Sequence, residues 1–143
     1  MERKHLQRKF AGKSPNRRRN RESQANTVVA TVPVVSGSYN SGPYAVAITP
    51  NGAFAYTANA AASTVSVIDT AANSVIATVP VGTAPHGLAI TPDGKFAYVG
   101  NEYSSTVSVI DTSTNTVVDT VHGVAVAPEG VAITPQSNAV SCR

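Results

Sequence analysis

Apolar and polar positions alternate along this chain in short runs, and turn residues separate the runs. Four such runs follow one another between Pro85 and Val121, and Thr-Pro-Asp-Gly at 91–94 separates the first two. Short runs rich in Val, Ile, Thr and Tyr and bounded by Gly, Pro, Asn and Asp are typical of β-strands. The pattern therefore predicts a unit of four strands over 85–121.

This unit occurs more than once. The turn sequence Thr-Pro-Asn-Gly at 49–52 recurs 42 residues later, and Thr64–Thr70 recurs without change at 106–112. A third copy begins at Pro128, where the spacing is 43 residues. A period of roughly 40–45 residues that carries four strands is typical of a β-propeller blade. The predicted fold class is all-β, with propeller-type blades of four antiparallel strands; a β-meander or sandwich is the alternative.

The residues on the two sides of the predicted strands support blades that pack on both faces. In the strand at 64–69, Val65 and Val67 lie on one face and Thr64, Ser66 and Ile68 on the other, because side chains alternate along a strand. Neither face carries a charge before the terminal aspartate. Strands that are buried on both faces have this composition.

The repeat predicts the organisation of the chain. Residues 26–34 match 73–81 and are therefore expected to form a fourth strand without the first three strands of its unit. The expected parts are a disordered basic tail at 1–24 and a partial propeller over 26–143, which consists of the orphan strand 26–34, a blade at 43–79, a blade at 85–121 and a half blade at 128–143.

The unit resembles the YVTN β-propeller repeat of bacterial and archaeal proteins, many of which are exported or lie on the cell surface. The motif from which that family takes its name corresponds here to Tyr56-Thr57-Ala58-Asn59 and to Tyr98-Val99-Gly100-Asn101, and the block Thr-Val-Ser-Val-Ile-Asp-Thr is equally characteristic. The resemblance covers about 26–143. It implies the fold, whereas function depends on the site that a fold carries.

Two complete blades are too few to close a ring, since closed propellers have typically 4–8 blades. The chain is therefore expected to form an open arc with a bare apolar face at each end, and such faces indicate a partner or aggregation. Three explanations would account for the small number of blades: self-association, membership of a longer propeller, or a truncated reading frame.

The net charge of +3 conceals an uneven distribution, because nine of the 11 Lys and Arg lie between Arg3 and Arg21. A basic tail of this kind can contact nucleic acid by charge alone, and Arg17, Arg18, Arg19 and Arg21 are the candidate residues. The favoured interpretation is a solvated tail without a partner, whose removal should leave the fold intact. No apolar stretch is long enough for a transmembrane helix, and no apolar h-region follows the charges of the tail as in a secretory signal, so localisation stays open.

The sequence contains little of the chemistry that a cofactor or metal needs. Cys142 is the single cysteine, and the three histidines have no metal-ligand spacing. Glycine-rich phosphate loops and the Gly-x-Ser-x-Gly motif are missing from the sequence. The chain is therefore expected to have no catalytic residues, no metal and no cofactor.

One position changes its chemistry from copy to copy. The residue after the proline that opens each unit is Tyr44, then His86, then Glu129, while its neighbours barely change. This position is expected at the mouth of the central channel, where the three residues would form a ligand-binding rim; a loop position that tolerates any residue is the alternative. The sequence therefore favours a non-enzymatic scaffold that binds a ligand or protein. The alternatives are part of a lactonase-like propeller hydrolase and a nucleic-acid-binding protein.

Overall fold

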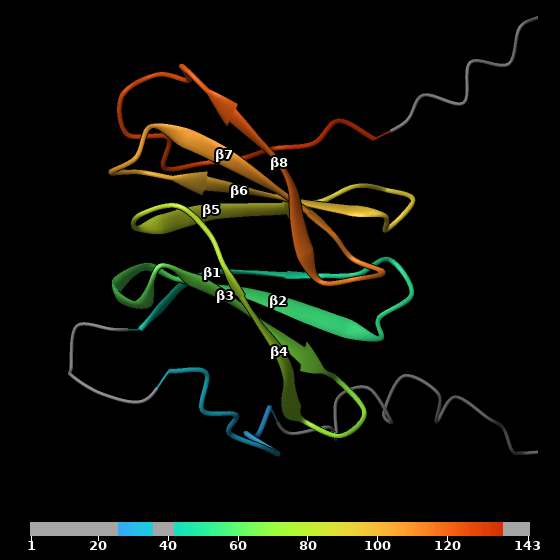
Figure 1. Cartoon of the computed structure of the whole chain (residues 1–143). Coiled ribbons are helices and arrows are strands. Elements are labelled where there is room, and N and C mark those ends of the chain that lie inside the picture. The colour runs from blue at the N-terminus through green and yellow to red at the C-terminus, as the bar shows by residue number, and fades with distance from the viewer. Residues whose placement is uncertain (1–25, 36–41, 136–143) are drawn as a thin grey trace, which may run out of the picture. The chain divides into compact units, whose positions relative to one another are not determined.

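The computed structural model describes residues 26–35 and 42–135 (Figure 1). They contain eight strands and one 3-10 helix: β1 (Pro43–Ile48), β2 (Phe54–Asn59), η1 (Ala60–Ala62), β3 (Thr64–Asp69), β4 (Ser74–Pro80), β5 (Pro85–Ile90), β6 (Phe96–Asn101), β7 (Thr106–Asp111) and β8 (Thr116–His122).

The strands form two four-stranded antiparallel sheets with the orders β1-β2-β3-β4 and β5-β6-β7-β8. Each strand pairs with the next one in the sequence, and equivalent strands of the two sheets pair in the same register. This is the meander of a propeller blade, so the predicted fold class is confirmed. The described residues form no closed ring, as the number of blades predicts.

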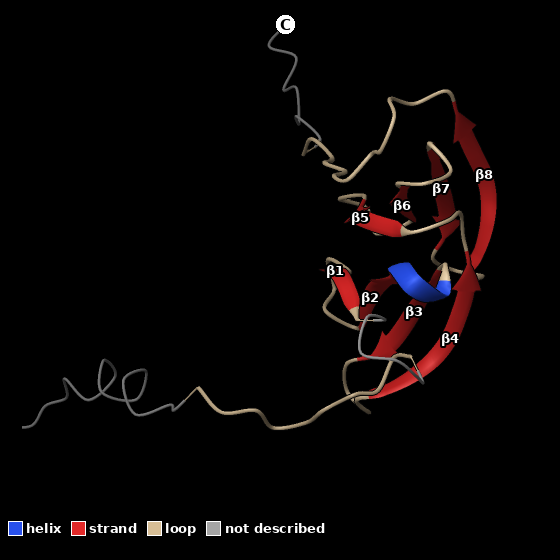
Figure 2. Ribbon diagram, turned by 90° about the vertical axis from the view of Figure 1, so that its left-hand side faces the viewer, coloured by secondary structure: helices blue, strands red, loops and turns tan. Residues whose placement is uncertain are grey.

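The two sheets pack face to face. Figure 2 shows β1 beside β5 on the inner side, and β4 and β8 on the outer side. The core between them combines one face of each sheet, with Tyr56, Val65 and Val67 from the first sheet and Val99 and Ile110 from the second, all fully buried. The apolar strand faces that the sequence predicts to be dry therefore meet here.

The turns form as their residues predict. Gly52 and Gly94 have φ of 75°, and each donates its backbone N–H to the carbonyl of the threonine that opens the turn, at 2.8 Å. Glycine adopts this left-handed conformation without steric cost. The aspartates at 69 and 111 accept backbone N–H groups of the next turn at 2.8 Å, which matches the predicted local role of short polar side chains.

The predicted orphan strand is not observed, because residues 26–35 have no regular secondary structure. A fourth strand takes its hydrogen bonds from a third strand, and the described residues contain none from the same unit. Residues 26–30 belong to a separate unit and are exposed. In the second unit, the carbonyl of Val34 accepts a hydrogen bond from Ser66 at 3.1 Å.

The first strand of the predicted half blade is also not observed as a strand. Residues 128–135 have no regular secondary structure, and residues 136–143, where its pairing partner was predicted, lie outside the described residues, as does the predicted tail at 1–24. In the part of the chain that the structure describes, no helix has the length and apolar character to cross a membrane.

Candidate functional site

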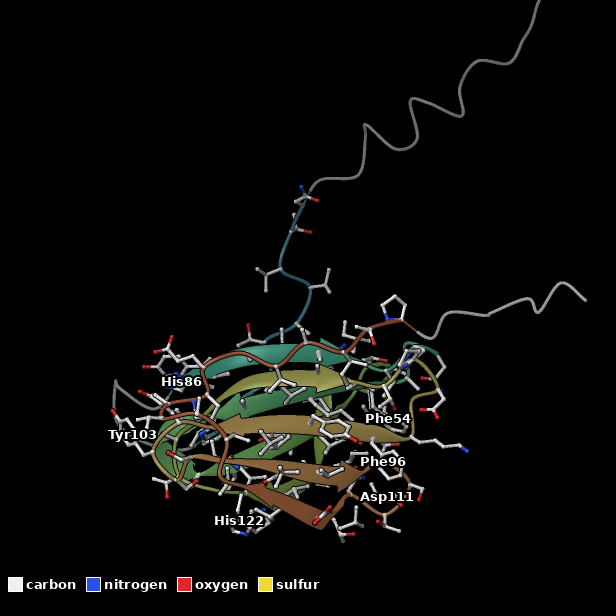
Figure 3. The ribbon with its side chains drawn as sticks, turned by 90° about the horizontal axis from the view of Figure 1, so that it is seen from above. Phe54, His86, Phe96, Tyr103, Asp111 and His122 are labelled. Carbon is white, nitrogen blue, oxygen red and sulfur yellow. The ribbon has the colours of Figure 1, made fainter. Side chains whose placement is uncertain are left out.

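The candidate site lies at the end of the sheets where β1 and β5 begin. Figure 3 shows His86 and Tyr103 at this end, and Phe54, Phe96 and Asp111 at the opposite end. The connection from β4 to β5 and the loop between β6 and β7 meet here. The backbone N–H of Glu102 donates to the carbonyl of Ala84 at 2.9 Å, and that of Tyr103 donates to Thr83 at 3.2 Å.

A backbone irregularity at the start of both first strands sets Tyr44 and His86 apart. In β1 the register shifts between Pro43 and Ala45, and in β5 it shifts between Pro85 and Gly87, so neither intervening residue has a Cα partner on the next strand. Bulges of this kind redirect a side chain and are frequent next to functional sites. The variable position that the sequence singled out is therefore a bulge in both blades.

The two bulge side chains stack on each other. The ring centroids of Tyr44 and His86 lie 4.2 Å apart with an interplanar angle of 14°. Tyr44 remains 63% exposed, so a large part of its surface is open to a ligand. Stacked aromatic rings present a flat, rigid surface with a polar edge.

An acidic side chain completes the arrangement. The Nδ1 atom of His86 lies 3.3 Å from Oε2 of Glu102, and the two side chains are 23% and 17% exposed. The loop contacts described above hold the backbone of Glu102 in this place. The pair therefore fixes the orientation of the imidazole ring that lies on Tyr44.

Glu129, the third predicted rim residue, lies on the segment that covers the second sheet. Its carbonyl oxygen is 2.8 Å from the point where a Cβ on Gly87 would stand, so this segment passes directly over the start of β5. Glu129 itself is exposed. The structure thus brings Tyr44 and His86 into contact and puts Glu129 on the neighbouring segment, whereas Arg17, Arg18, Arg19 and Arg21 lie outside the described residues.

Sequence reasoning missed Glu102. It stands directly after the repeated asparagine, where the first blade has Ala60, and this difference between the two loops was a readable signal. The loop after the second strand reaches the same end of a blade as the start of the first strand.

Beside this rim, each blade has a buried asparagine that ties its second strand to its third. Asn59 and Asn101 are fully buried, and each donates through Nδ2 to a threonine and a serine; the serine bonds are 2.9 Å long in both blades. The Oδ1 atom of Asn59 accepts a hydrogen bond from Thr57 at 3.3 Å. The Oδ1 atom of Asn101 is buried without a partner among the described residues, because Val99 replaces the threonine.

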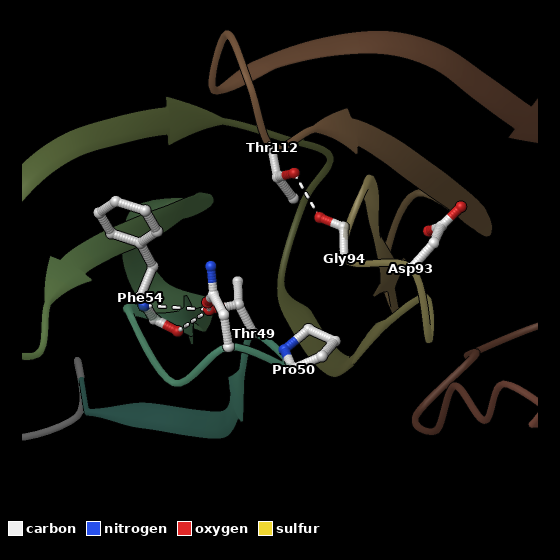
Figure 4. A pocket seen from close by; sticks show the side chains of 7 residues that line it. Thr49, Pro50, Phe54, Asp93, Gly94 and Thr112 are labelled. Atoms are coloured by element: carbon white, nitrogen blue, oxygen red, sulfur yellow. Dashed lines mark hydrogen bonds between the residues drawn. The ribbon is translucent and has the colours of Figure 1, made fainter.

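At the opposite end, a pocket of about 220 Å³ lies between the first turns of the two blades (Figure 4). Its polar groups are already used by the turns. The side chain of Thr112 donates to the carbonyl of Gly94, and Asp93 accepts hydrogen bonds from Thr91 and from the backbone of Lys95. The hydrogen bond from Thr91 is the main cause that lowers the pKa of Asp93. These contacts stabilise the turns, and they leave few free polar groups with which a ligand could form hydrogen bonds.

Two further pKa shifts also have structural causes. Ser113 lowers the pKa of Asp111 by hydrogen bonds from its side chain and backbone. Burial, followed by the nearby Asp111, raises the pKa of Tyr56, whose hydroxyl donates to Asn115 of the second blade at 2.7 Å. The described residues contain no group of three or more His, Cys, Asp or Glu that could hold a metal ion.

The meander sheets, their packing and the repeated hydrogen bonds define a β-propeller protein. A family model described as "Lactonase, 7-bladed beta-propeller" matches residues 16–135, and the chain belongs to this family. No curated protein matches the chain.

Solved structures that resemble the chain are propellers of diverse kinds. Hydrazine synthase of Kuenenia stuttgartiensis is 28% identical, with a TM-score of 0.61 over 73% of this chain and 29% of that one. The dihydro-heme d1 dehydrogenase NirN is 25% identical, with a TM-score of 0.50 over 54% and 16% of the two chains. The RRP9 WD40 repeats, at 16% identity and a TM-score of 0.57 over 64% and 29%, share the fold. The chain therefore spans less than a third of these structures.

Proposed function

We propose that the chain is a binding module of YVTN-type propeller repeats, which displays a ligand-binding rim at the end where its first strands begin. The observation that carries this proposal is the stack of Tyr44 on His86. The two blades have the same bulge, but it carries Tyr44 in the first blade and His86 in the second. A bulge that is repeated in the backbone and differs in its side chain is suited to ligand recognition.

Hydrolysis of a lactone is the second candidate function. It is supported by the family match and by the His86–Glu102 pair, since an imidazole held by a carboxylate is a common general base. A hydrolase also needs a group that stabilises the developing oxyanion. Neither Lys nor Arg lies near this pair in the described residues, because the one such side chain there, Lys95, follows the turn at the opposite end. A backbone N–H or a neutral side chain can also supply that group. Binding comes first because the exposed stack of Tyr44 on His86 is itself a contact surface and needs no further group.

The test screens a fragment library against the full chain by NMR and follows the ring protons of Tyr44 and His86. Replacing Tyr44, His86 and Glu129 together by Ala should abolish binding of the hits, which is followed in this variant by the NMR signals of the fragments themselves. The free energy of unfolding should change by about 0.5 kcal/mol or less at each of the exposed positions, Tyr44 and Glu129, and by more at His86, which is 23% exposed and pairs with Glu102. Full affinity in the triple variant would contradict the proposal.

A parallel assay separates the second candidate. Proton release is measured with γ-butyrolactone and δ-valerolactone as substrates. Turnover that His86→Asn and Glu102→Gln both remove would favour the hydrolase, whereas binding without turnover favours the module.

A further inference from the structure

We infer that the rim selects cationic ligands, namely molecules that carry an ammonium or guanidinium group; this inference rests on the proposed function of the same site. It identifies the chemical class of the ligand from the charges and the rings that surround the bulge at Tyr44 and His86.

The first argument is the aromatic surface. Tyr44 is 63% exposed and stacks at 4.2 Å on His86, so the pair forms a rigid platform rather than two free rings. Tyr103, which is 75% exposed, lies at the same end (Figure 3). The faces of aromatic rings attract cations, and guanidinium groups stack on them in particular.

The second argument is charge. Glu102 contacts the platform through His86, and Glu129 follows on the neighbouring segment. Among the described residues the one Lys or Arg is Lys95, next to the turn at the other end. The two described glutamates thus lie at the rim with no Lys or Arg of the described residues beside them, whereas the aspartates of the opposite end, Asp69, Asp93 and Asp111, share that end with Lys95. A site with an excess of negative over positive side chains attracts cations and repels anions.

The third argument is that backbone contacts hold the rim in place, so that the site is preformed. The bulge fixes the direction of each ring, and two backbone hydrogen bonds, from Glu102 to Ala84 and from Tyr103 to Thr83, hold the acidic loop against the start of β5. A ligand that meets a preformed site loses less conformational entropy on binding than one that must order it.

The experiment uses the full chain and two probes that differ in charge alone. N-acetyl-arginine methylamide carries a guanidinium, and N-acetyl-citrulline methylamide carries a neutral urea of nearly the same shape. NMR follows the ring protons of Tyr44 and His86, which are assigned with Y44F and H86N. We expect saturable shifts with the arginine probe, and an affinity for the citrulline probe that is at least about fivefold weaker.

Matched variants test the origin of the selectivity. Glu102→Gln should weaken binding of the arginine probe by about fivefold. Asp93→Asn removes the same charge at the opposite end, and it should leave the affinity unchanged, because Asn51 makes the equivalent turn contacts in the first blade. Equal binding of both probes, an equal loss in D93N, or no response to the arginine probe would overturn the inference. Equal binding of both probes at these rings would still leave the rim a ligand site, so failure of the charge selection is distinguishable from failure of the proposed function.

Discussion

Asn59 and Asn101 show how one changed neighbour alters a repeated hydrogen-bond network. Both amides donate to the same pair of hydroxyls in their blades, yet one carbonyl has a donor in Thr57 and the other faces Val99. A buried polar atom without a partner costs about 1–3 kcal/mol. The second blade therefore carries a local defect that the first blade lacks.

Val99→Thr should repair this defect. The new hydroxyl can donate to Oδ1 of Asn101 as Thr57 does to Asn59, and this gain exceeds the roughly 0.8 kcal/mol of burial that the lost methyl represents. We expect the free energy of unfolding to rise by about 1 kcal/mol in urea denaturation. Thr57→Val is the matched control and should lower it by about 1 kcal/mol. A loss in V99T as large as that in T57V would show that the carbonyl needs no donor.

Much at the residue scale is readable from the sequence, but not all of it. The Thr-Pro-Asx-Gly turns and the capping role of the aspartates follow from local chemistry, which adjacent residues decide. The stack of Tyr44 on His86, residues of different blades, depends on a bulge that hydrophobic alternation does not reveal. Glu102 was missed for a related reason, since its contact with His86 joins the bulge at the start of β5 to the loop that follows β6, and hydrophobic alternation does not report such contacts.

At the scale of elements, the two blades differ where a following segment packs on them. Ala45 and Ala58 pair in the first blade, whereas Gly87 and Gly100 pair at the equivalent positions of the second. A Cβ on Gly87 would stand 2.8 Å from the carbonyl oxygen of Glu129, and one on Gly100 would stand 2.8 Å from that of Pro128. These glycines are therefore required by the close approach of another backbone.

Gly100→Ala should push residues 128–131 away from the second sheet. Overpacking of this kind costs about 1–3 kcal/mol. We expect that loss in the free energy of unfolding, together with faster limited proteolysis between 124 and 135. Gly130→Ala is the control, because no atom lies within 4 Å of its Cβ position. Unchanged proteolysis in G100A would indicate that the segment does not rest on Gly100.

The elements also show where pattern reading fails. The apolar runs at 43–48 and 26–34 look equally strand-like, yet only the first is a strand. A run becomes a strand when a neighbour supplies its hydrogen bonds, and for 26–34 the described residues hold no third strand of the same unit. The repeat predicted the eight observed strands because each one has its partner next to it in the sequence.

At the scale of the whole molecule, the second sheet covers one face of the first sheet, and the described residues put no sheet on its other face. Leu88 is 9% exposed where it meets the first sheet, but its equivalent Val46 is 65% exposed, and Ile48, the equivalent of Ile90, is 59% exposed. Likewise Asn115 accepts the hydroxyl of Tyr56, whereas its equivalent Asn73 is exposed. The open face of the first sheet, defined by Val46, Ile48 and Asn73, is therefore suited to another blade.

We predict that this open face is covered by another blade, and that the full chain by itself associates through it at micromolar concentration. At roughly 25 cal/mol per Å² of apolar surface, burial of such a face is worth several kcal/mol, which is comparable with the 5–15 kcal/mol stability of a typical domain. Light scattering should show species larger than a monomer, and V46K/I48K should shift them toward the monomer. Val118→Lys on β8, which is 53% exposed, adds a charge elsewhere and should have little effect. A monomeric wild-type chain that binds no hydrophobic dye would contradict the prediction, because its apolar face would then be covered by the chain itself.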